Sequence, residues 1–85
     1  MQEHAITLYT RKQCPLCDKA KKSLLELQEE WNFSLKEIDI AESDDLTERF
    51  GLMIPVVYLD GEEIAFGMVN KFDISNRLQV KRAIF

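Results

Sequence analysis

The sequence predicts an α/β fold in which a mixed four-stranded sheet carries helices on both faces. Runs of β-prone residues and stretches of helical periodicity follow one another in the order βαβαββα. The first strand–helix–strand unit fits a right-handed parallel crossover, whereas Asp60-Gly61 between the last two strands marks an antiparallel hairpin. Helices on each side would bury both apolar faces of such a sheet. A length of 85 residues leaves room for one domain, spanning residues 1–85.

The first half of the chain supplies two strands and a long helix. Residues 5–9 form a short β-prone run, which we expect to be a central strand. From residue 15 to about residue 30, apolar side chains recur at helical spacing, while charged and polar side chains occupy the other positions. Residues 33–40 alternate between apolar and polar side chains after the first position, which is typical of a half-buried strand. The apolar positions of the helix are Leu16, Ala20, Leu24 and Leu27.

The second half of the chain supplies a short helix, the hairpin and a final helix. Polar residues at 43–45 are N-cap candidates for a helix that ends at Gly51. Residues 56–59 and 62–66 are the two β-prone arms of the predicted hairpin. Apolar residues at helical spacing after Gly67 predict the last helix, and they include Ile74 and Leu78.

Composition and charge exclude several classes of partner. The chain is 46% hydrophobic and 31% charged, with a net charge of −4, so nucleic acid and anionic membrane surfaces would not attract it. No apolar run approaches the roughly 20 residues that span a bilayer. Residues 1–4 lack the basic and then apolar pattern of a secretory signal. We therefore expect a cytoplasmic monomer without nucleic-acid or membrane partners.

The segment Cys14-Pro15-Leu16-Cys17 is the strongest chemical signal in the chain. It follows a predicted strand and opens a predicted helix. Pro15 suits the first helical position, because the N–H that it lacks would have no intrahelical partner there. Cys14 then stands at the N-cap and Cys17 one turn later on the same face, so the two sulfurs can meet. The positive end of the helix dipole favours the thiolate, which is the form that attacks disulfides.

This placement predicts a redox-active dithiol. Cytosolic thiols are kept reduced, and a permanent bridge around so small a loop would restrict the unfolded chain only weakly. Cys14 is predicted to attack the substrate disulfide, and Cys17 is predicted to resolve the mixed disulfide, after which the protein needs an external reductant. The alternative is two buried cysteines that act only as small hydrophobic side chains.

Other polar residues add one candidate and one alternative. Arg11 lies three positions before Cys14, where a cation could stabilise the thiolate or meet an anionic substrate group. A tetrahedral zinc site needs four ligands, so two cysteines and His4 predict no metal in a monomer. We expect His4 to be an exposed terminal side chain. An iron–sulfur cluster shared by two subunits stays open as an alternative.

With these pieces in order, the chain resembles the glutaredoxin-like proteins of the thioredoxin-fold superfamily, and the small prokaryotic glutaredoxin-like proteins in particular. The likeness runs over nearly the whole chain. The motifs that carry it are Leu8-Tyr9-Thr10-Arg11, Cys14-Pro15-Leu16-Cys17, Ile38-Asp39-Ile40, Gly51-Leu52-Met53-Ile54-Pro55-Val56, Asp60-Gly61 and Phe66-Gly67.

The resemblance implies a thioredoxin fold with the sheet order 2-1-3-4. It also implies a cis bond between Ile54 and Pro55, whereas X-Pro bonds in general are mostly trans. Pro55 would then lie beside Cys14 and shape the site. The backbone of Ile54 would pair in β fashion with the substrate strand.

The resemblance weakens at the glutathione site. Glutaredoxins typically hold the γ-glutamyl end of the tripeptide with a Gly-Gly pair followed by an acidic residue. Here Gly67 is the one glycine of that pair, and the neutral Asn70 stands about where the acid would be. Arg11 matches the family's basic residue, which would meet the glycine carboxylate. By resemblance, the substrate-binding candidates are Arg11, Ile54, Gly67 and Asn70.

The sequence therefore predicts a thiol–disulfide oxidoreductase. Its substrates would be disulfide-bearing proteins or glutathione mixed disulfides, and glutathione or a disulfide reductase would restore the dithiol. No tightly bound cofactor is expected. Two alternatives stay open: a non-catalytic redox sensor or adaptor, and a glutathione-dependent iron–sulfur cluster binder. A third is a purely structural domain without redox chemistry.

Overall fold

The computed structural model describes the backbone of residues 4–83 and the side chains of residues 4–80. This part of the chain forms four strands, three α-helices and one short 3₁₀ turn. In chain order they are β1 (His4–Thr10), α1 (Pro15–Gln28), β2 (Phe33–Asp39), η1 (Ile40–Glu42), α2 (Asp44–Phe50), β3 (Val56–Leu59), β4 (Glu62–Phe66) and α3 (Lys71–Ala83). The expected order βαβαββα is confirmed, with η1 as an addition between β2 and α2.

The four strands form one mixed sheet in the order β2-β1-β3-β4. β1 pairs with β2 in parallel, whereas the β1–β3 and β3–β4 pairs are antiparallel. This arrangement confirms both the mixed sheet and the order 2-1-3-4. β1 and β3 form the centre, and the register places Tyr9 opposite Val56 at the carboxyl end of β1.

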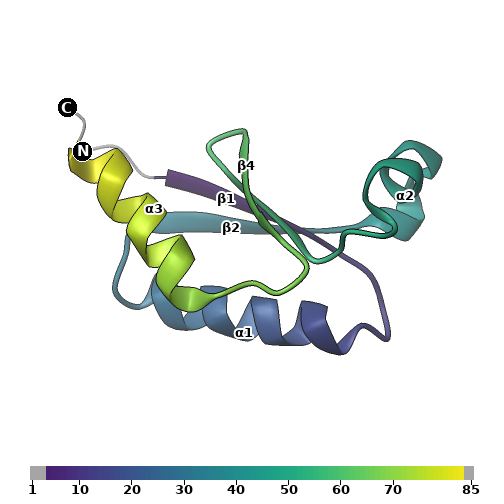
Figure 1. The fold of residues 1–85 in the computed structure, drawn as a ribbon, viewed down its shortest axis with the longest axis horizontal. Helices are drawn as coiled ribbons and strands as arrows, with labels where there is room; N and C mark the ends of the chain where they lie inside the picture. The colour runs from purple at the N-terminus through teal and green to yellow at the C-terminus, as the bar shows by residue number, and fades with distance from the viewer. Residues whose placement is uncertain (1–3, 84–85) are drawn as a thin grey trace.

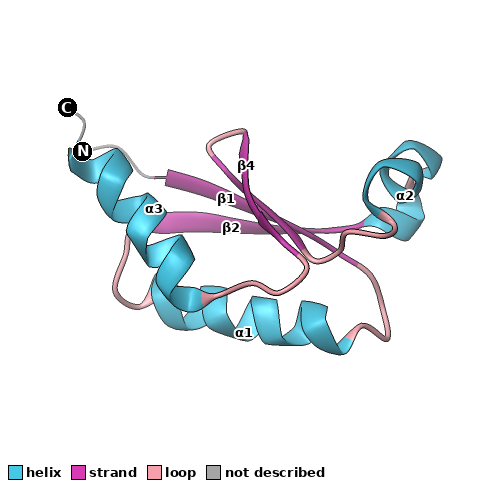
Figure 2. Ribbon diagram, in the orientation of Figure 1, coloured by secondary structure: helices cyan, strands magenta, loops and turns pink. Residues whose placement is uncertain are grey.

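Helices cover both faces of this sheet, as expected (Figures 1 and 2). α1 and α3 lie together on one side, where Leu8 and Val57 from the central strands join the larger hydrophobic core. Adjacent residues of a strand point to opposite faces. Tyr9 and Val56 therefore belong to the smaller cluster on the other face, together with Phe50 of α2. Figure 1 shows that α2 and the connection from β1 to α1 lie at the same end of the molecule.

Some boundaries differ from the sequence prediction. α1 ends at Gln28, two residues earlier than expected, and a tight turn follows in which the Trp31 amide donates to the Leu27 carbonyl at 2.8 Å. β2 ends at Asp39, so Ile40 opens η1 and does not extend the strand. The Asp39 carboxylate accepts a hydrogen bond from the Ala41 amide at 2.9 Å, which caps this 3₁₀ turn and stops the strand.

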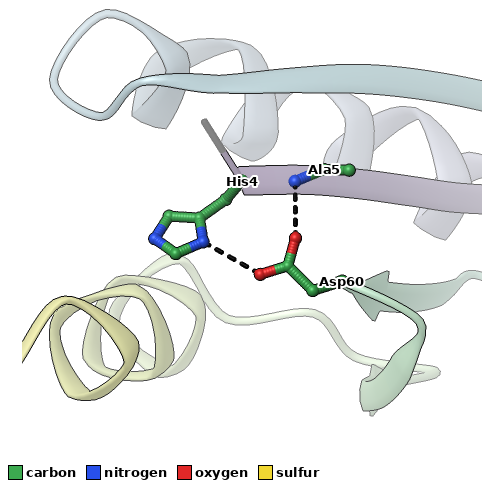
Figure 3. Close-up of polar contacts among 3 residues, drawn as sticks. All are labelled: His4, Ala5 and Asp60. Carbon is green, nitrogen blue, oxygen red and sulfur yellow. Dashed lines mark hydrogen bonds and ion pairs between the residues drawn. The ribbon is translucent and has the colours of Figure 1, made fainter. Parts of the chain in front are cut away.

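The hairpin turn is tied to the start of β1 by Asp60 (Figure 3). Asp60 and Gly61 both have positive φ, 51° and 85°, as a two-residue hairpin turn with the favoured twist requires. The Asp60 carboxylate accepts a hydrogen bond from the Ala5 amide at 2.8 Å and contacts Nδ1 of His4 at 2.9 Å. His4 is therefore a partly buried strand residue with a carboxylate partner, which corrects the expectation of an exposed terminal side chain.

A substitution in the larger core tests the packing of α1. Leu24 is 0% exposed, whereas its neighbour Leu25 is 47% exposed on the same helix. We expect Leu24→Ala to lower the free energy of unfolding by about 2–5 kcal/mol, because it leaves a cavity between α1 and the sheet. Leu25→Ala should change the free energy of unfolding by only about 0.5 kcal/mol. Urea denaturation followed by circular dichroism measures both, and equal losses would contradict this packing.

A second pair of substitutions tests the hairpin anchor. Asp60→Ala removes the acceptor for Ala5 and places alanine at a positive φ, so we expect a loss of roughly 2 kcal/mol in the free energy of unfolding. Asp60→Asn keeps a side-chain oxygen and a residue type that tolerates this backbone conformation. In the same urea experiment, Asp60→Asn should therefore lower the free energy of unfolding by less than half as much as Asp60→Ala does. Equal losses for the two variants would show that the carboxylate position does not anchor the hairpin.

Candidate active site

The two cysteines lie at the start of α1, as the sequence predicts. Cys14 is the N-cap residue, with an extended backbone (φ −124°, ψ 99°), and Pro15 follows at the first helical position. Sγ of Cys14 accepts a hydrogen bond from the Cys17 amide at 3.2 Å. The two residues are joined in a disulfide, with their Cα atoms 5.2 Å apart. The prediction that the two sulfurs can meet is therefore confirmed.

The two cysteines differ in accessibility. Cys17 is 1% exposed and belongs to the buried side of α1, whereas Cys14 is only partly buried. A reagent or substrate that approaches the helix terminus from solvent therefore reaches Cys14 first. The site has the asymmetry that a dithiol mechanism requires, namely one accessible sulfur and one sheltered sulfur behind it.

The residue before this pair adopts a conformation that the sequence does not reveal. Gln13 has a φ of 58°, in the left-handed region where non-glycine residues are uncommon. This turn ends the exposed loop from β1 and leads the chain into the N-cap at Cys14. A glycine or an asparagine would have signalled it, and glutamine is not such a signal.

The bond between Ile54 and Pro55 is cis, as the resemblance implies and against the general preference of X-Pro bonds. Pro55 is buried and immediately precedes β3. Tyr9, near the end of β1, pairs with Val56, the residue that directly follows Pro55. Pro55 thus stands at the end of the sheet from which β1 leads to the dithiol.

Gly67 joins this end of the sheet through its backbone. Its amide donates to the Pro55 carbonyl at 2.8 Å and to the Met53 carbonyl at 3.0 Å, with a φ of 72°. The amide of Ile54 donates to the Phe50 carbonyl at 3.0 Å. The structure therefore brings the predicted residues Ile54, Pro55 and Gly67 together in one hydrogen-bonded turn.

The remaining two predicted residues are exposed. Arg11 lies in the loop between β1 and α1, and none of the three ion pairs among the described side chains includes it. Asn70 caps α3, since its side-chain oxygen accepts a hydrogen bond from the Phe72 amide at 2.7 Å. The resemblance predicts that Asn70 binds substrate, and its capping role is an additional one that asparagine directly before a predicted helix would have indicated.

The described residues limit which metal ions the site could hold. Within residues whose side chains are described, no three His, Cys, Asp or Glu residues gather closely enough to hold a metal ion. Cys14 and Cys17 are the thiol ligands that the described residues could offer to a metal ion. None of the helices in the described part is long and apolar enough to cross a bilayer.

Comparison with known proteins agrees with this geometry. Residues 5–79 match the family described as "Glutaredoxin-like domain (DUF836)". An uncharacterized protein of Mycobacterium tuberculosis strain H37Rv is 30% identical over 90 residues, which cover 100% of this chain and 91% of that protein.

Solved structures show the same fold. Protein Ne2328 from Nitrosomonas europaea superimposes with a TM-score of 0.80 at 25% identity, over 92% of this chain and 94% of that one. A mutant thioredoxin from Halobacterium salinarum gives a TM-score of 0.75 at 17% identity, over 99% and 79% of the two chains, which shows the fold alone. With the family match over most of its length and a cysteine pair at disulfide distance on a thioredoxin fold, the chain belongs to the glutaredoxin-like (DUF836) family.

Proposed function

We propose that this protein is a thiol–disulfide oxidoreductase that reduces protein disulfides or mixed disulfides through Cys14 and Cys17. The observation that carries the proposal is the pairing of an accessible N-cap cysteine with a buried cysteine one turn later. The fold and the family match support a redox role. The substrates and the order of steps are part of the proposal.

The proposed reaction begins with the reduced dithiol. The Cys14 thiolate attacks one sulfur of the substrate disulfide, so a Cys14–substrate bond forms and the other substrate sulfur leaves as a thiolate. Cys17 then loses its proton and attacks Sγ of Cys14, which forms the Cys14–Cys17 disulfide and releases the second substrate thiol. Two electrons pass to the substrate. An external reductant, either two molecules of glutathione or a disulfide reductase, then returns two electrons to the Cys14–Cys17 disulfide, and no tightly bound cofactor on this chain is proposed to take part.

The helix terminus supports the first step. The Cys17 amide already donates to Sγ of Cys14, and a thiolate is a stronger acceptor than a disulfide sulfur. The dipole of α1 adds positive potential at the same position. Arg11 and Lys12 precede Cys14 in an exposed loop, while the carboxylate of Asp18 in the first turn opposes them. We propose that the helix terminus and these loop cations keep Cys14 ionised.

The turn around Pro55 is proposed to receive the substrate. Ile54 would pair with the backbone of the substrate, and Gly67 would leave space beside it. Because the Ile54 amide donates to the Phe50 carbonyl, pairing through this amide requires that hydrogen bond to open. We propose Pro55 as the residue that shapes the site, with Arg11 and Asn70 as polar contacts at its edge.

Serine substitutions test the two cysteine roles. We expect Cys14→Ser to abolish disulfide reduction, because the attacking sulfur is gone. Cys17→Ser should instead accumulate a covalent substrate adduct, since the sulfur that resolves it is missing. Intact-protein mass spectrometry detects the adduct, and circular dichroism confirms that both variants are folded. Full dithiol reductase activity in Cys17→Ser would show that the roles are wrong.

A turnover assay separates an enzyme from a redox sensor. We expect catalytic amounts of the protein to speed the reduction of insulin by dithiothreitol roughly tenfold over the same concentration of added free thiol, because the helix terminus favours the attacking thiolate. Insulin precipitation gives the rate, and the Cys14→Ser variant gives the background. A rate equal to that of free dithiothreitol would favour a sensor or adaptor that switches once per oxidation.

A further inference from the structure

Several exposed apolar side chains lie in the dithiol motif or beside the turn that precedes β3. Among the described side chains, seven large hydrophobic residues are exposed, and four of them lie in three segments that border the site. We name these four the apolar rim: Leu16, Leu52, Phe66 and Met68. Leu52 is fully exposed and Met68 is 81% exposed. Exposed apolar side chains that gather beside a reactive group are typical of an interaction surface.

Backbone contacts place three members of the apolar rim, Leu52, Phe66 and Met68, near one another. Leu52 and Met68 each adjoin a residue of the Met53–Gly67 hydrogen bond, which is 3.0 Å long. Phe66 pairs with Val56, the residue after Pro55, on the edge strand β4. Leu16 lies inside the dithiol motif itself, on the first turn of α1. The rim therefore combines one residue of the dithiol motif with three residues around the turn that precedes β3.

Positive charge flanks this rim, although the whole chain is acidic. Residues 11–19 carry three cations, Arg11, Lys12 and Lys19, and one carboxylate, Asp18. The segment therefore has a net charge of +2 in a chain of −4. Arg11, Lys12 and Lys19 are exposed and take part in none of the three ion pairs among the described side chains. An acidic group that approaches the dithiol thus meets a locally favourable potential.

We propose that this end of the molecule docks an extended segment of a disulfide-bearing protein, with apolar side chains beside its cysteine on the apolar rim and an acidic residue near Arg11 and Lys12. This inference rests on the proposed function and names its substrate class. Glutathione offers carboxylates for the cations but no apolar side chain for the rim. Asn70 is neutral, so this position lacks the carboxylate that would pair with the ammonium of glutathione, and its side-chain oxygen is already engaged as the cap of α3.

The test uses a set of mixed disulfides that share thionitrobenzoate as the leaving group. Each probe joins thionitrobenzoate to one thiol. Three of these thiols are cysteine peptides: one with glutamate and leucine beside the cysteine, one with lysine in place of the glutamate, and one with serine in place of the leucine. The other two are glutathione and mercaptoethanol, which is a small neutral reference. The peptides are made with both orders of flanking residues. Reduced full-length protein attacks the peptide sulfur and releases thionitrobenzoate, whose absorbance gives the rate.

We expect the glutamate–leucine peptide to react about tenfold faster than the glutathione probe. The rate of either altered peptide should be about threefold or more below that of the glutamate–leucine peptide. Leu52→Ser should lower the ratio of the peptide rate to the mercaptoethanol rate about fivefold, whereas the matched exposed control Leu25→Ser should leave that ratio unchanged. The double variant Arg11→Glu with Lys12→Glu should prefer the lysine peptide, and Lys22→Glu serves as its control.

Two outcomes would overturn the inference. One is a glutathione probe that reacts as fast as the glutamate–leucine peptide, which would mark a glutathione site. The other is an equal effect of Leu52→Ser and Leu25→Ser on the peptide ratio. Failure of the proposed function has a different signature, because then the mercaptoethanol probe also reacts no faster than it does with Cys14→Ser.

Discussion

The position of Cys14 at the N-cap of α1 is the constraint on which the site depends. Serine, threonine, aspartate and asparagine cap helices better than a sulfur does, so this position is not optimised for helix stability. Instead, Sγ of Cys14 accepts a hydrogen bond from the Cys17 amide, forms the disulfide with Sγ of Cys17 and lies at the positive end of the helix dipole. The stability of the first turn is thus coupled to the redox state of the pair, since a thiolate is a better acceptor for that amide than a disulfide sulfur.

The smaller hydrophobic cluster supports the other half of the site. The rings of Tyr9 and Phe50 lie 4.6 Å apart, and Tyr58 packs edge-on against both at 5.4 Å and 6.0 Å. These contacts fix α2 against the sheet beside the end of β1. The Phe50 carbonyl accepts hydrogen bonds from the amides of Met53 and Ile54. The turn that carries Pro55 therefore starts at a residue that is packed against the sheet. α2 is short, but its packing positions the segment that would meet the substrate.

The sequence predicts the regular elements well, because their signals are local. The spacing of Ala20, Leu24 and Leu27 predicts α1, and Asp60-Gly61 predicts the hairpin. Element boundaries depend on side-chain caps such as Asp39, which compete with the strand and are hard to weigh in advance. The cis bond before Pro55 follows from resemblance and not from local preference. The left-handed Gln13 has no sequence signal, because glutamine is not a residue type that favours this backbone conformation.

The candidate site shows why bulk charge is a weak guide to the partner of a small protein. A net charge of −4 argues against nucleic acid and anionic membranes, yet the segment around the dithiol is positive and exposed apolar side chains border the turn that precedes β3. The field at a site depends on the charges within about 10 Å, since salt screens those farther away. In the proposed docking, a substrate segment at Cys14 would therefore meet these cations and apolar side chains, whatever the charge of the rest of the chain. Under this proposal, a local positive segment would allow an acidic protein to attract an acidic substrate segment.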